Sequence, residues 1–207
     1  MDPVRSWPNG LLVADASVWI NLIAGARAGD VIRVLAMRPQ IPRIALDELE
    51  RGRDKGRRTA AALADLINDG LVEVTELSSE AEETYLNLVA GPVSQTLDDG
   101  EAATLALALH VGAVAIIDER KAINLARDRF PALQIMSTTE LLLSDAVRSV
   151  FSNEELGNVL YGALREARMR VPEHLLEAVC ACLGPERTAG CVSLPARVRQ
   201  SIRKTLA

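Results

Sequence analysis

Apolar and polar positions along the chain predict strands and helices in turn. Two short apolar runs, Leu11 to Ala14 and Ala113 to Ile117, have the pattern of buried strands. Further short runs at 41–44, 71–74 and 133–136 predict three more strands, and segments with helical spacing separate them. The run at 41–44 resembles an edge strand. Strands that alternate with helices indicate a parallel sheet covered by helices. The predicted fold class is therefore α/β.

From residue 145 onwards the pattern is helical only. Two capping boxes predict helix starts, Ser137 with Glu140 just before this region and Ser152 with Glu155 within it. Gly184 with Pro185 predicts the end of a helix. We expect an α/β domain at 1–144 and an all-helical C-terminal extension of unknown role at 145–207.

Composition narrows the classes of function. The chain has 207 residues, 49% of them apolar, which is enough to bury a core. Aromatic residues make up only 3%, so an aromatic platform for stacking bases is not expected. The net charge of -5 is uneven, because residues 145–207 carry nine Lys or Arg against seven Asp or Glu. An acidic site in the first part would account for some of this difference, and ordinary solvated acidic faces for most of it.

Nothing in the sequence predicts a secretory leader or a membrane segment. The longest apolar region, 102–117, is interrupted by polar residues and a glycine, and it reads as a helix, a turn and a strand. Cys180, Cys182 and Cys191 form an odd set near the C-terminus, so a reduced, cytoplasmic protein is expected. With His174 they could form a zinc site, but the Cys-x-Cys spacing favours buried apolar cysteines instead.

Four acidic residues carry the candidate chemistry. Asp15 and Asp118 directly follow the two buried strands, so both carboxylates should emerge at the carboxyl edge of the sheet. Glu48 lies in a predicted helix, and Glu101 lies in the first turn of another. Convergent carboxylates repel one another unless cations neutralise them, and Mg²⁺ or Mn²⁺ prefers such oxygen ligands. Such ions support phosphodiester hydrolysis.

Each acid also has a purely structural interpretation. Asp15 and Asp118 could cap the helices that follow them. Glu48 could be a solvated helix residue, and Glu101 could interact favourably with the helix dipole. Four independent structural roles need not fall where one cation site would require them, so the combination favours the site.

The order of four motifs resembles the PIN-domain ribonucleases, which include the toxins of bacterial toxin–antitoxin pairs. The resemblance covers about residues 10–144. It rests on Val13-Ala14-Asp15-Ala16-Ser17-Val18-Trp19-Ile20-Asn21, Ala45-Leu46-Asp47-Glu48-Leu49, Asp99-Gly100-Glu101-Ala102-Ala103 and Ile116-Ile117-Asp118-Glu119-Arg120.

The resemblance implies roles for individual residues. It makes Asp15 and Asp118 central metal ligands, Glu101 the third core acid, and Glu48 a ligand or a water-holding acid. Ser17 stands where a hydroxyl commonly supports the first Asp. Many members have Asp in place of Glu101, and the neighbouring Asp98 and Asp99 lie close enough to compete for that role.

The resemblance also implies function and partners. It implies a cytoplasmic endoribonuclease that uses Mg²⁺ or Mn²⁺, cuts RNA and is the toxin of a toxin–antitoxin pair, with an antitoxin as partner and self-association left open. A basic cluster after Glu48 would hold the RNA backbone or meet the antitoxin, or it is simply solvated surface: Arg51, Arg53, Lys55, Arg57 and Arg58.

Two other functions remain as alternatives. One is a catalytically weak PIN-like binding or regulatory module that acts through its C-terminal helices. The other is a helical DNA-binding regulator in residues 145–207, for which only the basic excess argues.

Overall fold

The computed structural model describes residues 10–35, 38–52 and 54–206. The chain divides into two compact units, Met1–Val18 with Ala36–Met136 and Trp19–Leu35 with Ser137–Ala207. Each unit therefore combines stretches that are distant in the sequence. The expected boundary near residue 145 remains a prediction.

The first unit is built on a parallel sheet of five strands in the order β3-β2-β1-β4-β5. The strands are β1 (Leu12–Ala14), β2 (Pro39–Pro42), β3 (Glu73–Thr75), β4 (Val114–Ile116) and β5 (Ile135–Met136). In the centre of the sheet, Ala14 is paired with Ile116, and the Asp15 N–H donates to the Ile116 carbonyl at 3.2 Å. This confirms the predicted parallel sheet and places the ends of β1 and β4 side by side.

One expected strand has a different position. The pattern at 41–44 suggested a strand at the edge of the sheet, but β2 covers Pro39–Pro42 and lies between β1 and β3. The two prolines stand at the first and last positions of the strand, where a missing N–H is tolerated best. Ile44 belongs to the helix that follows.

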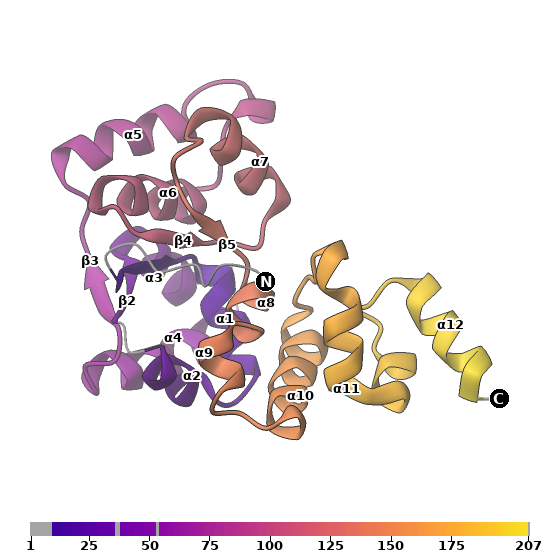
Figure 1. The fold of residues 1–207 in the computed structure, drawn as a ribbon. Helices are drawn as coiled ribbons and strands as arrows, with labels where there is room; N and C mark the ends of the chain where they lie inside the picture. Colours follow the sequence, from indigo (N-terminus) through magenta and orange to yellow (C-terminus); the bar gives the residue numbers. More distant parts are fainter. Residues whose placement is uncertain (1–9, 36–37, 53, 207) are drawn as a thin grey trace. The chain divides into compact units, whose positions relative to one another are not determined.

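The helices of the first unit are α3 (Arg43–Arg51), α4 (Asp54–Asn68), α5 (Ser79–Val89), the 3₁₀ turn η2 (Val93–Gln95), α6 (Asp99–Val111) and α7 (Arg120–Arg129). Helix α6 packs on the sheet against β1, β2 and β4, and α5 lies against the outside of α6 (Figure 1). Nearly all of α6 from Gly100 to Ala108 is buried, and Gly112 ends it in the left-handed conformation. The helix thus carries its first turn to the edge where the strands end.

The core of this unit is aliphatic. Val13 of β1, Ala115 of β4 and Ile117, directly after β4, are fully buried and pack with Leu88 of α5 and Leu105 of α6. The low aromatic content of the sequence is consistent with this core, because close packing of the sheet and α6 needs small and branched side chains.

The second unit is helical. Helix α1 (Ala16–Ala24) begins in the first unit and continues into the second, followed there by α2 (Ala28–Val34), α8 (Thr138–Leu142), α9 (Asp145–Arg148), α10 (Asn153–Gly162), the π-helical turn η3 (Ala163–Ala167), the 3₁₀ turn η4 (Glu173–Leu175), α11 (Leu176–Gly190) and α12 (Ala196–Leu206). The predicted capping boxes at Ser137 and Ser152 are both present. The backbone of α11 is interrupted at Gly184, where the sequence predicted a stop.

Helices α10 and α11 pack closely at a glycine. A Cβ atom at Gly157 would overlap the carbonyl oxygen of Cys182 and lie 3.3 Å from its carbonyl carbon. Glycine therefore allows the backbones of the two helices to approach.

Within the described ranges, no helix is long and apolar enough to cross a membrane.

Candidate active site

Asp15 links the end of β1 to the start of α1. Its carboxylate is buried, and its Oδ2 atom accepts hydrogen bonds from the Ser17 hydroxyl at 2.7 Å and from the Ser17 N–H at 3.1 Å. These are the bonds of a helix N-cap, so the structural interpretation of Asp15 is correct. The cap alone does not explain why this buried carboxylate also lies near other acids.

Glu48 and Asp15 meet at Gly100. Glu48 extends from α3, and Gly100 lies in the first turn of α6. A Cβ atom at Gly100 would overlap Glu48 Oε2 and would lie 3.2 Å from Asp15 Oδ1. Oxygens of both carboxylates therefore approach the same point, and the absence of a side chain at Gly100 leaves them the space.

Glu101 and Asp98 bring further acidic groups from the start of α6. The half-buried Glu101 carboxylate accepts a hydrogen bond from the Asp98 N–H, which is one half of a capping box. Asp98 stands at the N-cap position but its side chain makes no capping hydrogen bond. The Asp98 carboxylate is therefore not occupied by the helix end.

The pKa values show how strongly these acids interact. Burial raises the pKa of Asp15 above its ordinary range, against the hydrogen bonds from Ser17 and Ala16, and the charge of Asp98 raises it further. Loss of hydration and the charges of Asp15 and Asp98 raise the pKa of Glu101 from its ordinary value of 4.5 to about 7.

The pKa of Glu48 is also raised. Partial loss of hydration is the main cause, followed by the negative charges of Asp15, Asp98 and Asp99, while Arg51 acts in the opposite direction. The charge of Asp98 thus acts on Asp15, Glu48 and Glu101, so these acids share one electrostatic environment.

Asp99 has a different neighbour. Its Oδ1 atom accepts a hydrogen bond from the Tyr85 hydroxyl at 3.0 Å, which ties the start of α6 to α5. Its charge raises the pKa of Glu48 but is not among the main causes of the shifts at Asp15 and Glu101. Of the two adjacent aspartates, Asp98 is more closely coupled to the other acids.

Asp118 reaches the same edge of the sheet through the backbone. It lies two residues beyond β4, which pairs directly with β1, and its side chain is half-buried. Because Ala14 pairs with Ile116, Asp15 and Asp118 emerge from neighbouring strands at the same end, as the sequence predicted.

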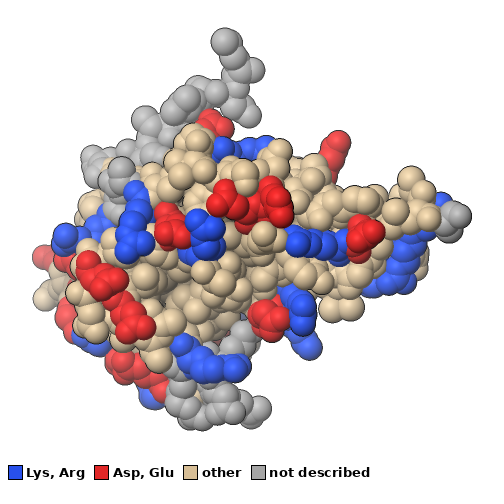
Figure 2. Space-filling view, turned by 90° about the horizontal axis from the view of Figure 1, so that it is seen from below, with Lys and Arg blue, Asp and Glu red and all other residues tan. Residues whose placement is uncertain are grey.

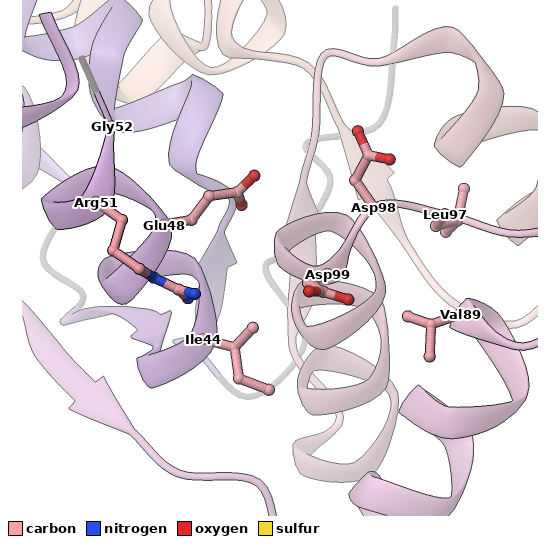
Figure 3. Close-up of a pocket in the computed structure, with 8 residues that line it drawn as sticks. All are labelled: Ile44, Glu48, Arg51, Gly52, Val89, Leu97, Asp98 and Asp99. Carbon is pink, nitrogen blue, oxygen red and sulfur yellow. The ribbon is translucent and has the colours of Figure 1, made fainter.

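A pocket of about 580 Å³ lies between α3 and the start of α6. Figure 3 shows Glu48 and Arg51 extending from α3 toward Asp98 and Asp99. The remaining lining is Ile44, Gly52, Val89 and Leu97. The pocket thus has acidic walls, one arginine and an apolar base, and it is large enough for part of a nucleotide.

The predicted basic cluster is only partly described. Arg51 lines the pocket and its Nε atom donates to the Asp47 carbonyl at 3.1 Å, while Arg58 is exposed in α4. Arg53 and the side chains of Lys55 and Arg57 lie outside the described residues. Of this cluster, Arg51 is the member for which the structure gives a place beside the acids.

The chemistry of the donors fits a hard divalent cation. All four predicted acids offer carboxylate oxygens. Burial raises the pKa values of Asp15, Glu48 and Glu101, and repulsion from neighbouring acids, which a cation would neutralise, raises them further. Among the described residues, no three His, Cys, Asp or Glu side chains form a ready-made metal-binding group. Asp15, Glu48, Asp98 and Glu101 are gathered into one region, and Asp118 follows the neighbouring strand at the same edge of the sheet.

Sequence reasoning underestimated Gly100 and Asp98. The signal for Gly100 was present in the run Asp98-Asp99-Gly100-Glu101, because a glycine in the first turn of a helix has poor helix propensity and needs another reason. Glu119 was also missed: its charge raises the pKa of Glu101, and its position immediately after Asp118 could have indicated this.

The comparisons with known proteins agree with this geometry. No curated protein matches the chain. A family model described as a PIN domain matches residues 11–184, which is most of the chain and extends 40 residues past the expected boundary at 144. PIN domains have a nuclease-type fold, generally use divalent metal ions and act on nucleic acid. The extent of the match, together with the parallel sheet and the acids at its edge, shows that this chain belongs to the PIN-domain family.

Proposed function

We propose that this protein is a metal-dependent endoribonuclease that hydrolyses RNA phosphodiester bonds. The observation that carries the proposal is the approach of Asp15 and Glu48 to one point at Gly100, with Asp98 and Glu101 beside them. Such a concentration of acids is unfavourable by itself and becomes useful when divalent ions are bound.

Asp15, Glu101 and Asp118 would hold Mg²⁺ or Mn²⁺. When bound, the ion supplies Lewis acidity toward the phosphate and favours ionisation of water. Ser17 fixes one oxygen of Asp15 by two hydrogen bonds and so orients the other toward Gly100. We add Asp98 to these acids as a supporting residue in place of Asp99, because its charge acts on Asp15, Glu48 and Glu101.

Glu48 and Arg51 would act on the substrate side of the pocket. The raised pKa of Glu48 makes its carboxylate a stronger base, which suits a group that accepts a proton from a water molecule. Arg51 lines the same pocket and offers a guanidinium that can pair with a phosphate oxygen. Arg53, Lys55, Arg57 and Arg58 would extend this contact along the RNA backbone.

We also propose a cellular role and an organisation. The protein would be the toxin of a toxin–antitoxin pair in the cytoplasm, with a cognate antitoxin as its partner. Residues 1–144 would form the nuclease domain, and residues 145–207 a helical extension.

The deciding experiment combines metal binding with RNA cleavage. The wild-type protein should take up Mn²⁺ in a calorimetric titration and cut a mixed RNA pool only when Mn²⁺ or Mg²⁺ is present. Asp15→Asn should lose both properties and keep its circular dichroism spectrum, because the amide still accepts the Ser17 hydrogen bonds. Cleavage by Asp15→Asn that still requires metal would remove Asp15 from the mechanism.

The same experiment tests the alternative of a binding module. Uptake of Mn²⁺ without any cleavage of the RNA pool would favour a catalytically weak regulatory protein.

A further inference from the structure

The second unit contains a pocket that the acidic site does not explain. The pocket has a volume of about 390 Å³, and it is lined by Arg168, Met169, Arg170, Val192 and Ser193. Its walls come from two segments, one directly after η3 and one directly after α11. No acidic residue lines it, in contrast to the pocket beside Glu48.

The two segments are held together by specific contacts. The Ser193 hydroxyl donates to the Leu164 carbonyl at 2.6 Å, which ties the turn after α11 to η3. Met169 is buried and its N–H donates to the Ala163 carbonyl at 3.1 Å. Since Met169 is directed inward, its exposed neighbours Arg168 and Arg170 are left on the solvent side of the pocket.

The backbone at Arg168 is unusual. Its φ and ψ angles of 59° and 37° lie in the left-handed region, which normally favours glycine at the end of a helix. Arginine is less stable than glycine in this conformation, but it places a guanidinium group at the pocket. Residues held in such conformations are concentrated at functional sites.

Most other cations of this unit already have partners. Arg165 pairs with Glu166 and Arg197 with Glu173, while Arg199 and Arg203 donate to backbone carbonyls and Arg187 lies over the ring of Tyr161. Figure 2 shows the blue side chains of α12 gathered at the right. Three of the four cations of this helix already have an ion pair or a hydrogen bond. Among the described residues, Arg168 and Arg170 have no partner for their guanidinium groups and line one pocket.

The turn after α11 adds two further donors. Within the described part of the chain, the N–H groups of Val192 and Ser193 enter no hydrogen bond. The Val192 side chain is 76% exposed and offers an apolar contact next to these donors. The pocket thus combines two arginines with a small apolar surface, and two of its lining residues have backbone N–H groups without a hydrogen bond.

We propose that this pocket binds a phosphate group in the backbone of single-stranded RNA. Arginine pairs with phosphate through two parallel N–H donors, and unpaired backbone N–H groups complete such sites. The exposed Val192 would contact the sugar or base next to the phosphate. The inference rests on the proposed function in that RNA is the ligand, but it requires neither the metal nor cleavage.

Binding of RNA without cleavage is the test. The full chain carrying Asp15→Asn, kept in EDTA, is titrated with a fluorescent single-stranded RNA at several salt concentrations. Adding Arg168→Ala and Arg170→Ala should weaken binding at least tenfold at low salt. The slope of log affinity against log salt should become shallower by about 0.7 for each lost phosphate contact.

Arg165→Ala is the matched control, because Arg165 is exposed nearby in η3 and already pairs with Glu166. Arg168→Lys with Arg170→Lys keeps both charges and should retain most of the affinity. If the alanine pair does not fold, Arg168→Gln with Arg170→Gln replaces it, because glutamine removes the charge and keeps a long polar side chain. An alanine pair or a glutamine pair that folds and binds RNA no differently from Arg165→Ala would overturn the proposal.

Two additional ligands identify what the pocket recognises. Inorganic phosphate should compete with RNA only weakly, because it lacks the neighbouring sugar and base. A poly-glutamate peptide that binds through Arg168 and Arg170, while RNA does not, would make this a protein-docking site and overturn the proposal. If the metal-loaded wild type binds RNA through Arg168 and Arg170 but does not cut it, the nuclease function is refuted and the proposal for this pocket stands.

Discussion

Ser17 donates both its hydroxyl and its backbone N–H to the same oxygen of Asp15. One carboxylate oxygen is thereby committed to the start of α1, and the other lies near Gly100. A helix cap and a candidate metal ligand are thus the same residue, and this arrangement can be tested directly.

Replacing Ser17 should weaken both roles of Asp15. Ser17→Ala removes the 2.7 Å hydrogen bond to a buried carboxylate, so we expect unfolding free energy to fall by about 1.5–3 kcal/mol. The pKa of Asp15 should rise further, and Mn²⁺ affinity should fall. Urea denaturation and calorimetry measure the two effects. Ser79→Ala, at the exposed first position of α5, is the control and should leave Mn²⁺ affinity unchanged.

Adding one methyl group at Gly100 should disturb the site more than the fold. The new Cβ atom overlaps Glu48 Oε2, the end of a flexible side chain, so Glu48 should move aside at a cost of about 1 kcal/mol. Displacement of this carboxylate should reduce cleavage roughly 100-fold. Gly190→Ala, where a Cβ atom meets no other atom within 4 Å, should keep full activity. Equal activity of the two variants would contradict the role given to Gly100.

The raised pKa of Glu101 should make the stability of the metal-free protein depend on pH. The folded protein keeps the proton up to about pH 7, whereas the unfolded chain releases it near 4.5. Stability should therefore fall as pH rises from 4.5 to 7, by at most about 3 kcal/mol, and then level off. Glu101→Gln should lose the share of this dependence that comes from Glu101, and the share from Asp15 and Glu48 should remain. Chemical denaturation in EDTA across this pH range measures the stability. Identical pH profiles for the wild type and Glu101→Gln would contradict the raised pKa of Glu101.

Asp98 and Asp99 provide a matched pair of substitutions. Asp98→Asn removes a charge that acts on Asp15, Glu48 and Glu101, so it should lower the pKa of Glu101 and weaken Mn²⁺ binding. Asp99→Asn removes a charge that acts on Glu48 and leaves an acceptor for Tyr85, so both quantities should change little. NMR titration of the Glu101 carboxyl distinguishes them. A larger effect from Asp99→Asn would reverse the assignment.

Gly157→Ala should act on stability alone. The Cβ atom would overlap the Cys182 carbonyl oxygen, and backbone cannot move aside as a side chain can. We expect a loss of about 3 kcal/mol or more in unfolding free energy. Mn²⁺ affinity of the folded fraction should be unchanged. Thermal unfolding like that of Gly190→Ala would show that α10 and α11 tolerate a wider separation.

Much of the fold followed from local signals in the sequence. The capping boxes at Ser137 and Ser152 were recognised because side chain and backbone satisfy each other within four residues. The strands ending before Asp15 and Asp118 were recognised because both faces of a central parallel strand are buried. The position of β2 was misjudged, since proline at both ends resembles an edge strand and order within the sheet depends on distant partners.

The site was predictable in its residue types and less so in its arrangement. The acids could be named from strand ends and a helix start. Which of Asp98 and Asp99 joins them depends on the Tyr85 hydroxyl, which approaches from another helix. The role of Gly100 depends on α3 lying against α6, and no local pattern specifies that contact.

The pairing of β1 with β4 also has a consequence for biosynthesis. The first acid is translated about a hundred residues before Asp118, yet their strands are neighbours in the finished sheet. A ribosome-bound chain that ends before β4 therefore lacks Asp118 and the strand that pairs with β1 at this edge. The proposed nuclease activity would therefore arise only after almost the whole first unit has been synthesised and folded.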